Sequence, residues 1–171
     1  MQKETTQYPL PVEILEKRIG YAFKNRRLIE TALTHSSYAN ELHARGDDRV
    51  ESYERLEFLG DSVLSIIASD YLFEHYRHFA EGELTKIRAA AVCEGALFEY
   101  TKTFSGGDFL RIGHGEELTH GRQRRSILAD IFEAILAAIY LDGGYRAARD
   151  FALPHLVEKI RELASHGNGE D

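Results

Sequence analysis

Four carboxylates in two apolar stretches are the residues of this 171-residue chain best suited to chemistry. Glu57 and Asp61 lie four positions apart within residues 53–76, and Asp130 and Glu133 lie three positions apart within residues 126–141. Both spacings place the two acids of a pair on one face of an α-helix. If the two helices pack together through these faces, four oxygen-bearing side chains converge on one site.

The first pair could simply be a solvated helix face, which is the usual explanation for acids one turn apart. A solvated stripe is expected to carry lysine or arginine one turn away, because opposite charges offset the repulsion. Only Arg55 is near, and it points elsewhere on the helical wheel, whereas Glu54 extends the acidic stripe. Stacked carboxylates without partners favour a cation, and their hard oxygens suit Mg2+ or Mn2+.

The second pair interrupts a stretch, SILADIFEAILAAIYL, that is apolar nearly all round and therefore predicts a buried helix. Burying an unpaired carboxylate costs several kcal/mol, so Asp130 and Glu133 need a salt bridge, a proton or a metal ion. The helix itself contains no lysine or arginine. We therefore favour metal ligation over a buried ion pair.

Four converging carboxylates carry enough charge for one or two divalent ions. Two such ions ~3.5–4 Å apart can activate water and stabilise a leaving oxygen, which is a common arrangement for phosphodiester hydrolysis. No other part of the sequence places a nucleophile beside a base at suggestive spacing. The single cysteine, Cys93, excludes a cysteine-based zinc site and is expected to be a small core residue on a helix.

The elements that must position these acids are predicted to be helices, giving an all-α fold of six or seven helices. Their expected limits are a helix from Pro9–Pro11 to Gly20, one capped by Asn25, a central helix over 53–76, one over 84–104, one over 126–141 ended by Gly143–Gly144, and one over 145–164 kinked at Pro154. Residues 43–51 and 108–125 are expected to be loops. Gly60 within the central helix predicts that some other group approaches the helix backbone closely there. His35, at a helix end, is expected to be structural rather than a ligand.

Length and composition indicate one soluble domain over residues 1–165, followed at 166–171 by a truncated linker or a disordered tail. No apolar run is long enough to span a membrane, and the N-terminus has no secretory signal. A lone cysteine fits a reducing, cytoplasmic location.

The net charge of −7 argues against a nucleic-acid partner when taken alone. Its distribution argues the other way, because three arginines precede the helix at 126. Basic side chains at a helix N-terminus favour anions, so we rank phosphate contact slightly ahead of a solvated loop. The candidate RNA-binding residues are Arg122, Arg124, Arg125, Lys86 and Arg88.

Four segments resemble the ribonuclease III family, in order and over residues 10–165. They are LTHSSYANE (33–41), ERLEFLGDSVLS (54–65), EGELTKIRA (81–89) and SILADIFEAILAAIYLDGG (126–144). The resemblance implies that family's all-α endonuclease domain. It further implies a cytoplasmic homodimer that cuts double-stranded RNA with Mg2+, for which Mn2+ can substitute. The expected products carry 5′-phosphates, 3′-hydroxyls and short 3′ overhangs, as in rRNA and mRNA processing.

By the same resemblance, the four acids named above are the metal ligands, and Asp61 and Glu133 are the pair usually named as catalytic. Glu54 and Glu81 match two further acids of the catalytic valley, and Phe58 is expected at the dimer interface. Family members usually continue into a double-stranded-RNA-binding domain, so the ending GNGED favours truncation of a longer protein.

Two other hypotheses remain open. The first is a catalytically silent RNA-binding or ribosome-associated protein of the same fold, and the second is a structural helical dimer whose acids are merely paired. A silent relative is expected to lose one or more of the four acids, and all four are present here.

Overall fold

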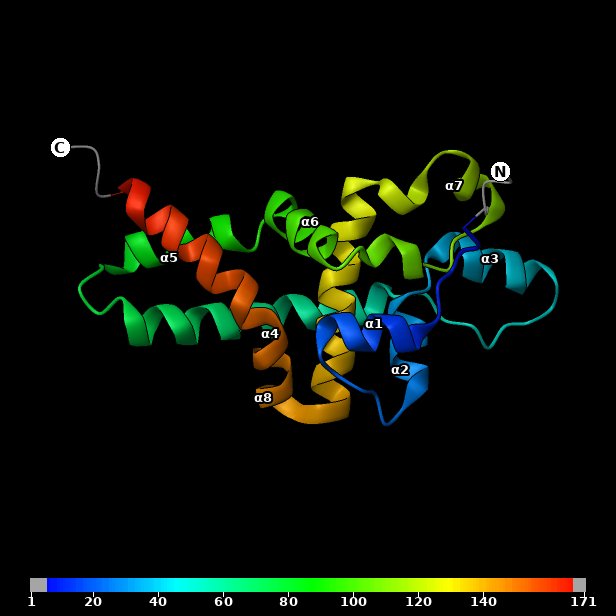
Figure 1. Ribbon diagram of the computed structural model, residues 1–171, viewed down its shortest axis with the longest axis horizontal. Coiled ribbons are helices and arrows are strands. Elements are labelled where there is room, and N and C mark those ends of the chain that lie inside the picture. Colours follow the sequence, from blue (N-terminus) through cyan, green and yellow to red (C-terminus); the bar gives the residue numbers. More distant parts are fainter. Residues whose placement is uncertain (1–5, 168–171) are drawn as a thin grey trace, which may run out of the picture.

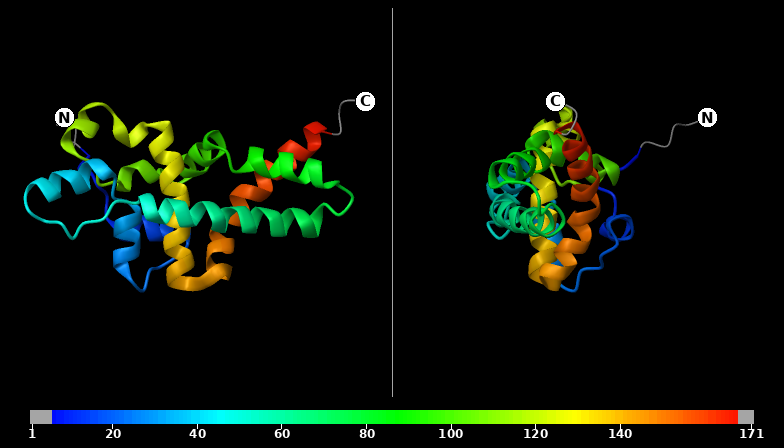
Figure 2. Two further views of the ribbon diagram at one scale, coloured as in Figure 1. Left: turned by 180° about the vertical axis from the view of Figure 1, so that it is seen from behind. Right: turned by 90° about the vertical axis from the view of Figure 1, so that its left-hand side faces the viewer.

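Two long helices, α4 (Glu54–His75) and α8 (Arg125–Gly167), cross at the centre of the computed structural model, which describes residues 6–167 (Figures 1 and 2). The remaining elements surround this crossing. They are α1 (Val12–Ile19), α2 (Arg26–Ala32), α3 (Ser36–Ala44), α5 (Glu81–Ala91), α6 (Glu94–Thr103), α7 (His114–Leu118) and the short 3₁₀ helices η1 (Gly106–Phe109) and η2 (Gly121–Gln123). Among the described residues the only β-type pairing is an isolated bridge between Thr34 and Arg111. The all-α prediction is confirmed.

The described residues form eight α-helices, whereas six or seven were predicted. The helix expected over 84–104 is two helices, and α7 lies within residues 108–125, which were wrongly predicted to be a loop. Cys93 has an extended backbone (φ −70°, ψ 163°) and precedes α6, and its thiol is exposed. The expectation of a core cysteine was therefore wrong. At 3.6 residues per turn, five residues between Ala91 and Ala96 would turn these two side chains about 140° apart. The break at Cys93 lets both reach the core, where they are buried.

The limits of several helices follow the predicted signals. Gly20 ends α1 with a left-handed backbone (φ 74°), and the side chain of Asn25 accepts a hydrogen bond from the backbone nitrogen of Arg27 at the start of α2. Within α8, Gly144 is the residue whose angles leave the helical region (φ 86°, ψ −179°), so the helix end predicted at Gly143–Gly144 is confirmed as a break, and Pro154 lies inside the helical part that follows.

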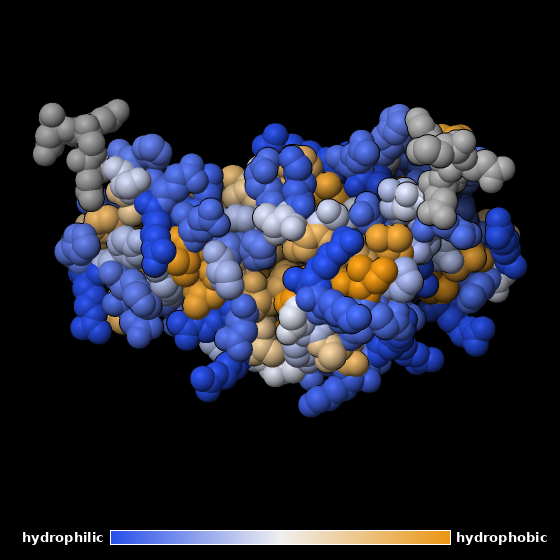
Figure 3. All heavy atoms as spheres, viewed as in Figure 1, coloured by the Kyte–Doolittle hydropathy of each residue, from blue (hydrophilic) through white to orange (hydrophobic). Residues whose placement is uncertain are grey.

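The first part of α8 is the most deeply buried element, as its apolar composition predicted. Ile131, Phe132 and Ile135 are fully buried, and they pack against the inner side of α4, where Leu64 and Ile67 are also fully buried. The surface is largely hydrophilic, with separate apolar patches on the face drawn in Figure 3. No helix in the described part of the chain is long and apolar enough to cross a lipid bilayer.

The end of α8 lies slightly beyond the predicted domain boundary. The helix continues to Gly167, so the segment predicted to be a linker or tail from residue 166 begins within the last helical turn. Residues 168–171, which make up the rest of that segment, lie outside the described residues.

Candidate active site

Helices α4 and α8 come into close backbone contact at Gly60. A Cβ atom added to Gly60 would lie 1.8 Å from the backbone oxygen of Glu133, a distance that no real side chain could adopt. The close backbone approach predicted from this glycine is therefore confirmed. Its consequence is that the acids on either side of Gly60, Glu57 and Asp61, are held against the acids of α8.

The four acids meet at the crossing as two pairs. The carboxyl group of Asp61 lies within hydrogen-bonding reach of that of Glu133, and the carboxyl group of Glu57 lies within reach of that of Asp130. Glu133 is only 8% exposed, Glu57 and Asp130 are half-buried, and Asp61 is exposed. The site therefore runs from solvent at Asp61 to the protein interior at Glu133.

Burial and mutual repulsion raise the pKa values of these acids. Burial is the main cause at Glu133, and the nearby carboxylates, Asp61 first among them, help to raise its pKa to about 8. Burial followed by the charge of Asp130 raises the pKa of Glu57 to about 7. The pKa of Asp130 is also raised by burial, although a hydrogen bond from Tyr53 opposes the change. At pH 7 the raised pKa values leave Glu133 mostly and Glu57 partly protonated, and a cation would displace these protons.

In the described part of the chain, no basic side chain forms an ion pair with the acids of the site. The Oε2 atom of Glu133 is buried and has no hydrogen-bond partner. A buried carboxylate can be explained by a salt bridge, a proton or a metal ion. The described structure contains no such salt bridge, so a bound proton or a metal ion is left as the explanation.

The donor set fits a hard divalent cation in kind. Carboxylate oxygens are the ligands that Mg2+ and Mn2+ prefer, and the unpartnered Glu133 oxygen is one such donor. In the side-chain positions described, no group of three or more histidine, cysteine, aspartate or glutamate residues is arranged to hold one ion. The acids stand as pairs, and joint ligation would require their side chains to turn toward a common ion.

The two accessory acids are not placed alike. Glu54 is exposed at the first turn of α4, and its charge contributes to the raised pKa of Glu57, so it belongs to the same acidic stripe. Glu81 begins α5 and lines a different pocket, together with Asp70 and Phe73 near the other end of α4. Within one chain, the structure brings Glu54 to the four acids and leaves Glu81 apart from them.

The arginines before α8 are largely engaged within the protein. Arg122 is 11% exposed, pairs with Glu117 at 2.8 Å and donates to the backbone oxygens of Gly107 and Leu110. Arg124 pairs with Glu116 at 2.6 Å. These two arginines tie the segment between α6 and α8 together, which the sequence did not reveal.

The other basic candidates are spread over two helices. Arg125 lies with its guanidinium carbon 5.6 Å from the centre of the Phe98 ring. Arg88 donates to the Ser69 hydroxyl at 2.8 Å, and Lys86 is exposed on α5. The five candidates therefore do not form a single free basic cluster.

Two residues next to the acids have structural roles. His35 precedes α3, and its Nδ1 accepts a hydrogen bond from the Ser37 backbone nitrogen at 3.1 Å, so the structural interpretation of His35 is confirmed. Tyr53 precedes α4 and was not singled out from the sequence. It is 4% exposed, and its hydroxyl donates to Oδ2 of Asp130 at 3.1 Å. The available signal was its position, because a buried tyrosine hydroxyl needs a partner and an acidic stripe follows directly.

A family model described as Ribonuclease-III-like matches residues 25–160, which include all four acids. The chain belongs to the ribonuclease III-like family. It is 49% identical over 152 residues to Ribonuclease 3 of Clostridium beijerinckii, covering 89% of this chain and 63% of that protein. It is 51% identical over 146 residues to Ribonuclease 3 of Clostridium perfringens, covering 85% and 60% respectively. The ribonuclease III-like chain thus spans about three-fifths of the length of these relatives.

Solved structures agree with the family assignment. The nuclease domain of ribonuclease III from Campylobacter jejuni superimposes with a TM-score of 0.79 at 36% identity, covering 88% of this chain and 99% of that one. A second structure of that nuclease domain gives a TM-score of 0.76 at 37% identity. The first of these two structures is described as showing flexibility in a region involved in dimer formation of that nuclease domain. The predicted ribonuclease III endonuclease-domain fold is confirmed.

Proposed function

We propose that this ribonuclease III-like domain is an Mg2+-dependent endoribonuclease that hydrolyses double-stranded RNA. The expected products are 5′-phosphate and 3′-hydroxyl ends with short 3′ overhangs, and the expected role is cytoplasmic rRNA and mRNA processing. The observation that carries this proposal is the meeting of four acids at the α4–α8 crossing, with the Glu133 Oε2 atom buried and unpartnered. Family membership makes RNA the expected substrate of that site.

The acids have different parts in the proposed chemistry. Glu57, Asp61, Asp130 and Glu133 would hold one or two Mg2+ ions, with Mn2+ as a substitute, and Asp61 and Glu133 are the proposed catalytic pair. When bound, Mg2+ activates water and stabilises the leaving oxygen. Glu133 offers a buried oxygen without a competing donor, at the inner end of the site. Asp61 faces solvent, from which the substrate must approach.

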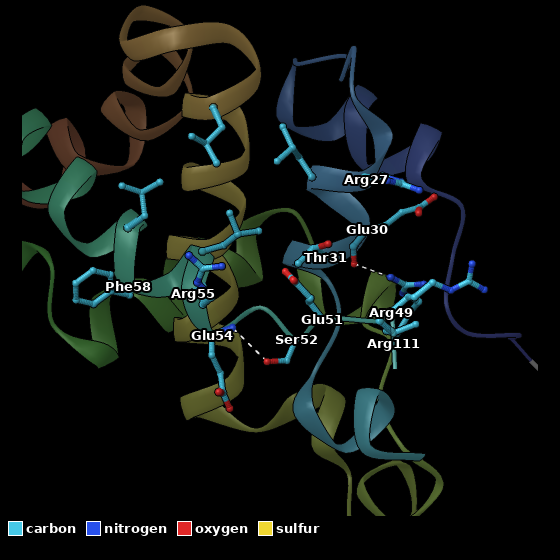
Figure 4. Close-up of a pocket in the computed structure, with 15 residues that line it drawn as sticks. Arg27, Glu30, Thr31, Arg49, Glu51, Ser52, Glu54, Arg55, Phe58 and Arg111 are labelled. Atoms are coloured by element: carbon cyan, nitrogen blue, oxygen red, sulfur yellow. Dashed lines mark hydrogen bonds between the residues drawn. The ribbon is translucent and has the colours of Figure 1, made fainter. Parts of the chain in front are cut away.

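We further propose that the active form is a homodimer. Phe58 is 80% exposed on α4, directly after Glu57. Beside it lies a groove of about 1100 Å³, with Phe58 and Arg27 on opposite sides in Figure 4. Leu28, Leu59 and Leu141 line this groove. The Phe58 ring of a second copy is the proposed occupant, and a two-fold axis through such contacts would provide one acid cluster for each RNA strand.

The basic candidates remain proposals for backbone contact with RNA. Lys86 and Arg125 are exposed and can meet phosphates as they stand. Arg88, Arg122 and Arg124 would first have to exchange their present hydrogen-bond partners. We therefore expect the domain alone to bind duplex RNA weakly and with strong salt dependence. Glu54 is proposed as an accessory acid of this site, whereas Glu81 lies apart from the four acids within one chain and keeps only the accessory role that the family resemblance implies.

Incubation of the protein with a long RNA duplex, with and without Mg2+, separates this proposal from a silent RNA-binding protein. The expected result is short duplexes with 5′-phosphates, formed only when Mg2+ is present. A protein that binds the duplex and leaves it intact at millimolar Mg2+ would support the silent alternative. An exposed-site variant on α6, Glu99→Gln, is a suitable control and should cleave like the wild type.

A further inference from the structure

The hydroxyl group of Tyr53 donates a hydrogen bond to one of the four acids of the site. It donates to Oδ2 of Asp130 at 3.1 Å, and the tyrosine is 4% exposed. Among the hydrogen bonds found in residues 6–167, none donates to the side chains of Glu57, Asp61 or Glu133. Asp130 is therefore distinguished from the other three acids by having a fixed partner.

Tyr53 is itself held from two directions. Its backbone nitrogen donates to the backbone oxygen of Thr34 at 2.8 Å, and its ring packs beside His35, with ring centres 5.9 Å apart. Thr34 is in turn held by Arg111, whose guanidinium donates to the Thr34 hydroxyl at 2.6 Å. The hydroxyl of Tyr53 therefore projects from an anchored ring, and it can hold a carboxylate in one orientation.

The chemistry of this contact leaves one oxygen of Asp130 available. A phenol has a single hydrogen to donate, so it engages Oδ2 and does not occupy Oδ1. Groups that hydrogen-bond to metal-binding side chains orient them, and losing such a group typically weakens metal binding by roughly 10–100-fold. Asp130 lies on α8 and Tyr53 immediately precedes α4, so the bond also ties the start of α4 to α8 at the site.

We infer that Tyr53 is a positioning residue of the metal centre, whose hydroxyl orients Asp130 so that its Oδ1 atom serves the cation. This inference rests on the proposed metal-dependent function of the four acids. It adds a role for the segment 34–53, because Thr34 and His35 hold the tyrosine that holds the ligand.

The inference can be tested without measuring activity, by determining the Kd for Mn2+ with titration calorimetry. We expect Tyr53→Phe to keep the buried ring and to raise the Kd for Mn2+ by about 10–100-fold. The matched control is Tyr100→Phe, which also removes one buried hydroxyl, in this case bonded to the Ala91 backbone oxygen at 2.7 Å. The control should change the Kd less than twofold. Cleavage by Tyr53→Phe should recover as Mg2+ is raised, whereas a merely destabilised enzyme would not recover.

A thermodynamic cycle with Asp130→Asn shows whether Tyr53 acts through Asp130. In that background, Tyr53→Phe should have no further effect on Mn2+ affinity. Three results would each overturn the inference and leave the metal site intact. They are a wild-type Kd for Mn2+ in Tyr53→Phe, an equal rise of that Kd in Tyr100→Phe, and a rise of the Kd by Tyr53→Phe that is as large in the Asp130→Asn background as in the wild type. Failure of the wild type itself to bind Mn2+ would overturn the proposed function together with the inference.

Discussion

Replacing Glu133 with glutamine should stabilise the metal-free protein at high pH. The carboxyl group of Glu133 has a pKa of about 8 in the folded protein, against an ordinary value of 4.5. Between these two values the folded state holds a proton that the unfolded state has released. The free energy of unfolding of the wild type must therefore fall as pH rises from about 4.5 to about 8. Glutamine does not titrate, so it removes this dependence.

The magnitude follows from the separation of the two pKa values. One pKa unit corresponds to about 1.4 kcal/mol, so the advantage of the Glu133→Gln variant over the wild type should grow by about 2–4 kcal/mol between pH 5 and pH 8. The lower figure applies if the proton is shared between Glu133 and the neighbouring Glu57, so that the titration is divided between the two groups. The cost of burying the amide is the same at both pH values and cancels from this difference.

Urea unfolding in EDTA at pH 5, 6, 7 and 8 measures the effect. Glu99→Gln, which removes an exposed carboxylate on α6, is the control and should run parallel to the wild type. If the curve of Glu133→Gln also runs parallel to the wild type, burial and repulsion do not raise the pKa of Glu133 and the reasoning is refuted. In a parallel experiment with Mg2+ in place of EDTA, the unfolding free energy of the wild type should rise relative to that of Glu133→Gln, because the cation replaces the proton on Glu133.

Three further predictions test the packing, the metal and the assembly. Gly60→Ala should lower the free energy of unfolding, measured in urea, by about 3 kcal/mol or more, because the new Cβ meets the Glu133 backbone. The control Gly82→Ala has open space around its Cβ and should cost little, so equal urea midpoints for the two variants would contradict the described crossing. Mg2+ should raise the melting temperature of the wild type, with about 2.7 kcal/mol gained at one hundred times Kd, and a melting temperature indifferent to Mg2+ would count against the site. Phe58→Asp should shift sedimentation toward monomer by burying a charge at the interface, whereas Leu118→Asp, on exposed α7, should not; a wild type that is monomeric at micromolar concentration would argue against the dimer.

The parts of this structure that the sequence predicted are those fixed by local pattern. The spacing of Glu57 with Asp61, and of Asp130 with Glu133, determines helix faces irrespective of the rest of the fold. Gly60 was informative because a glycine costs stability inside a helix, and only a close neighbour explains it. Apolar composition similarly predicted that the first half of α8 would be buried.

The parts that the sequence did not predict depend on contacts between distant segments. The break at Cys93 reflects which faces of α5 and α6 meet the core, and helical spacing alone continued through it. Arg122 looked like a phosphate contact, but Glu117 and two backbone oxygens occupy it. The bond from Tyr53 to Asp130 spans 77 positions, so no local motif could reveal it.

The rate of duplex RNA cleavage by the wild type and by Glu133→Gln, measured across Mg2+ concentrations, tests the proposed metal-dependent hydrolysis most directly. We expect the wild-type rate to rise from near zero in EDTA with added Mg2+. The variant, which keeps the fold and loses one anionic ligand, should show almost no cleavage at any Mg2+ concentration. Cleavage by the variant at nearly the wild-type rate under limiting Mg2+, or cleavage by the wild type in EDTA, would contradict the proposed role of the four acids.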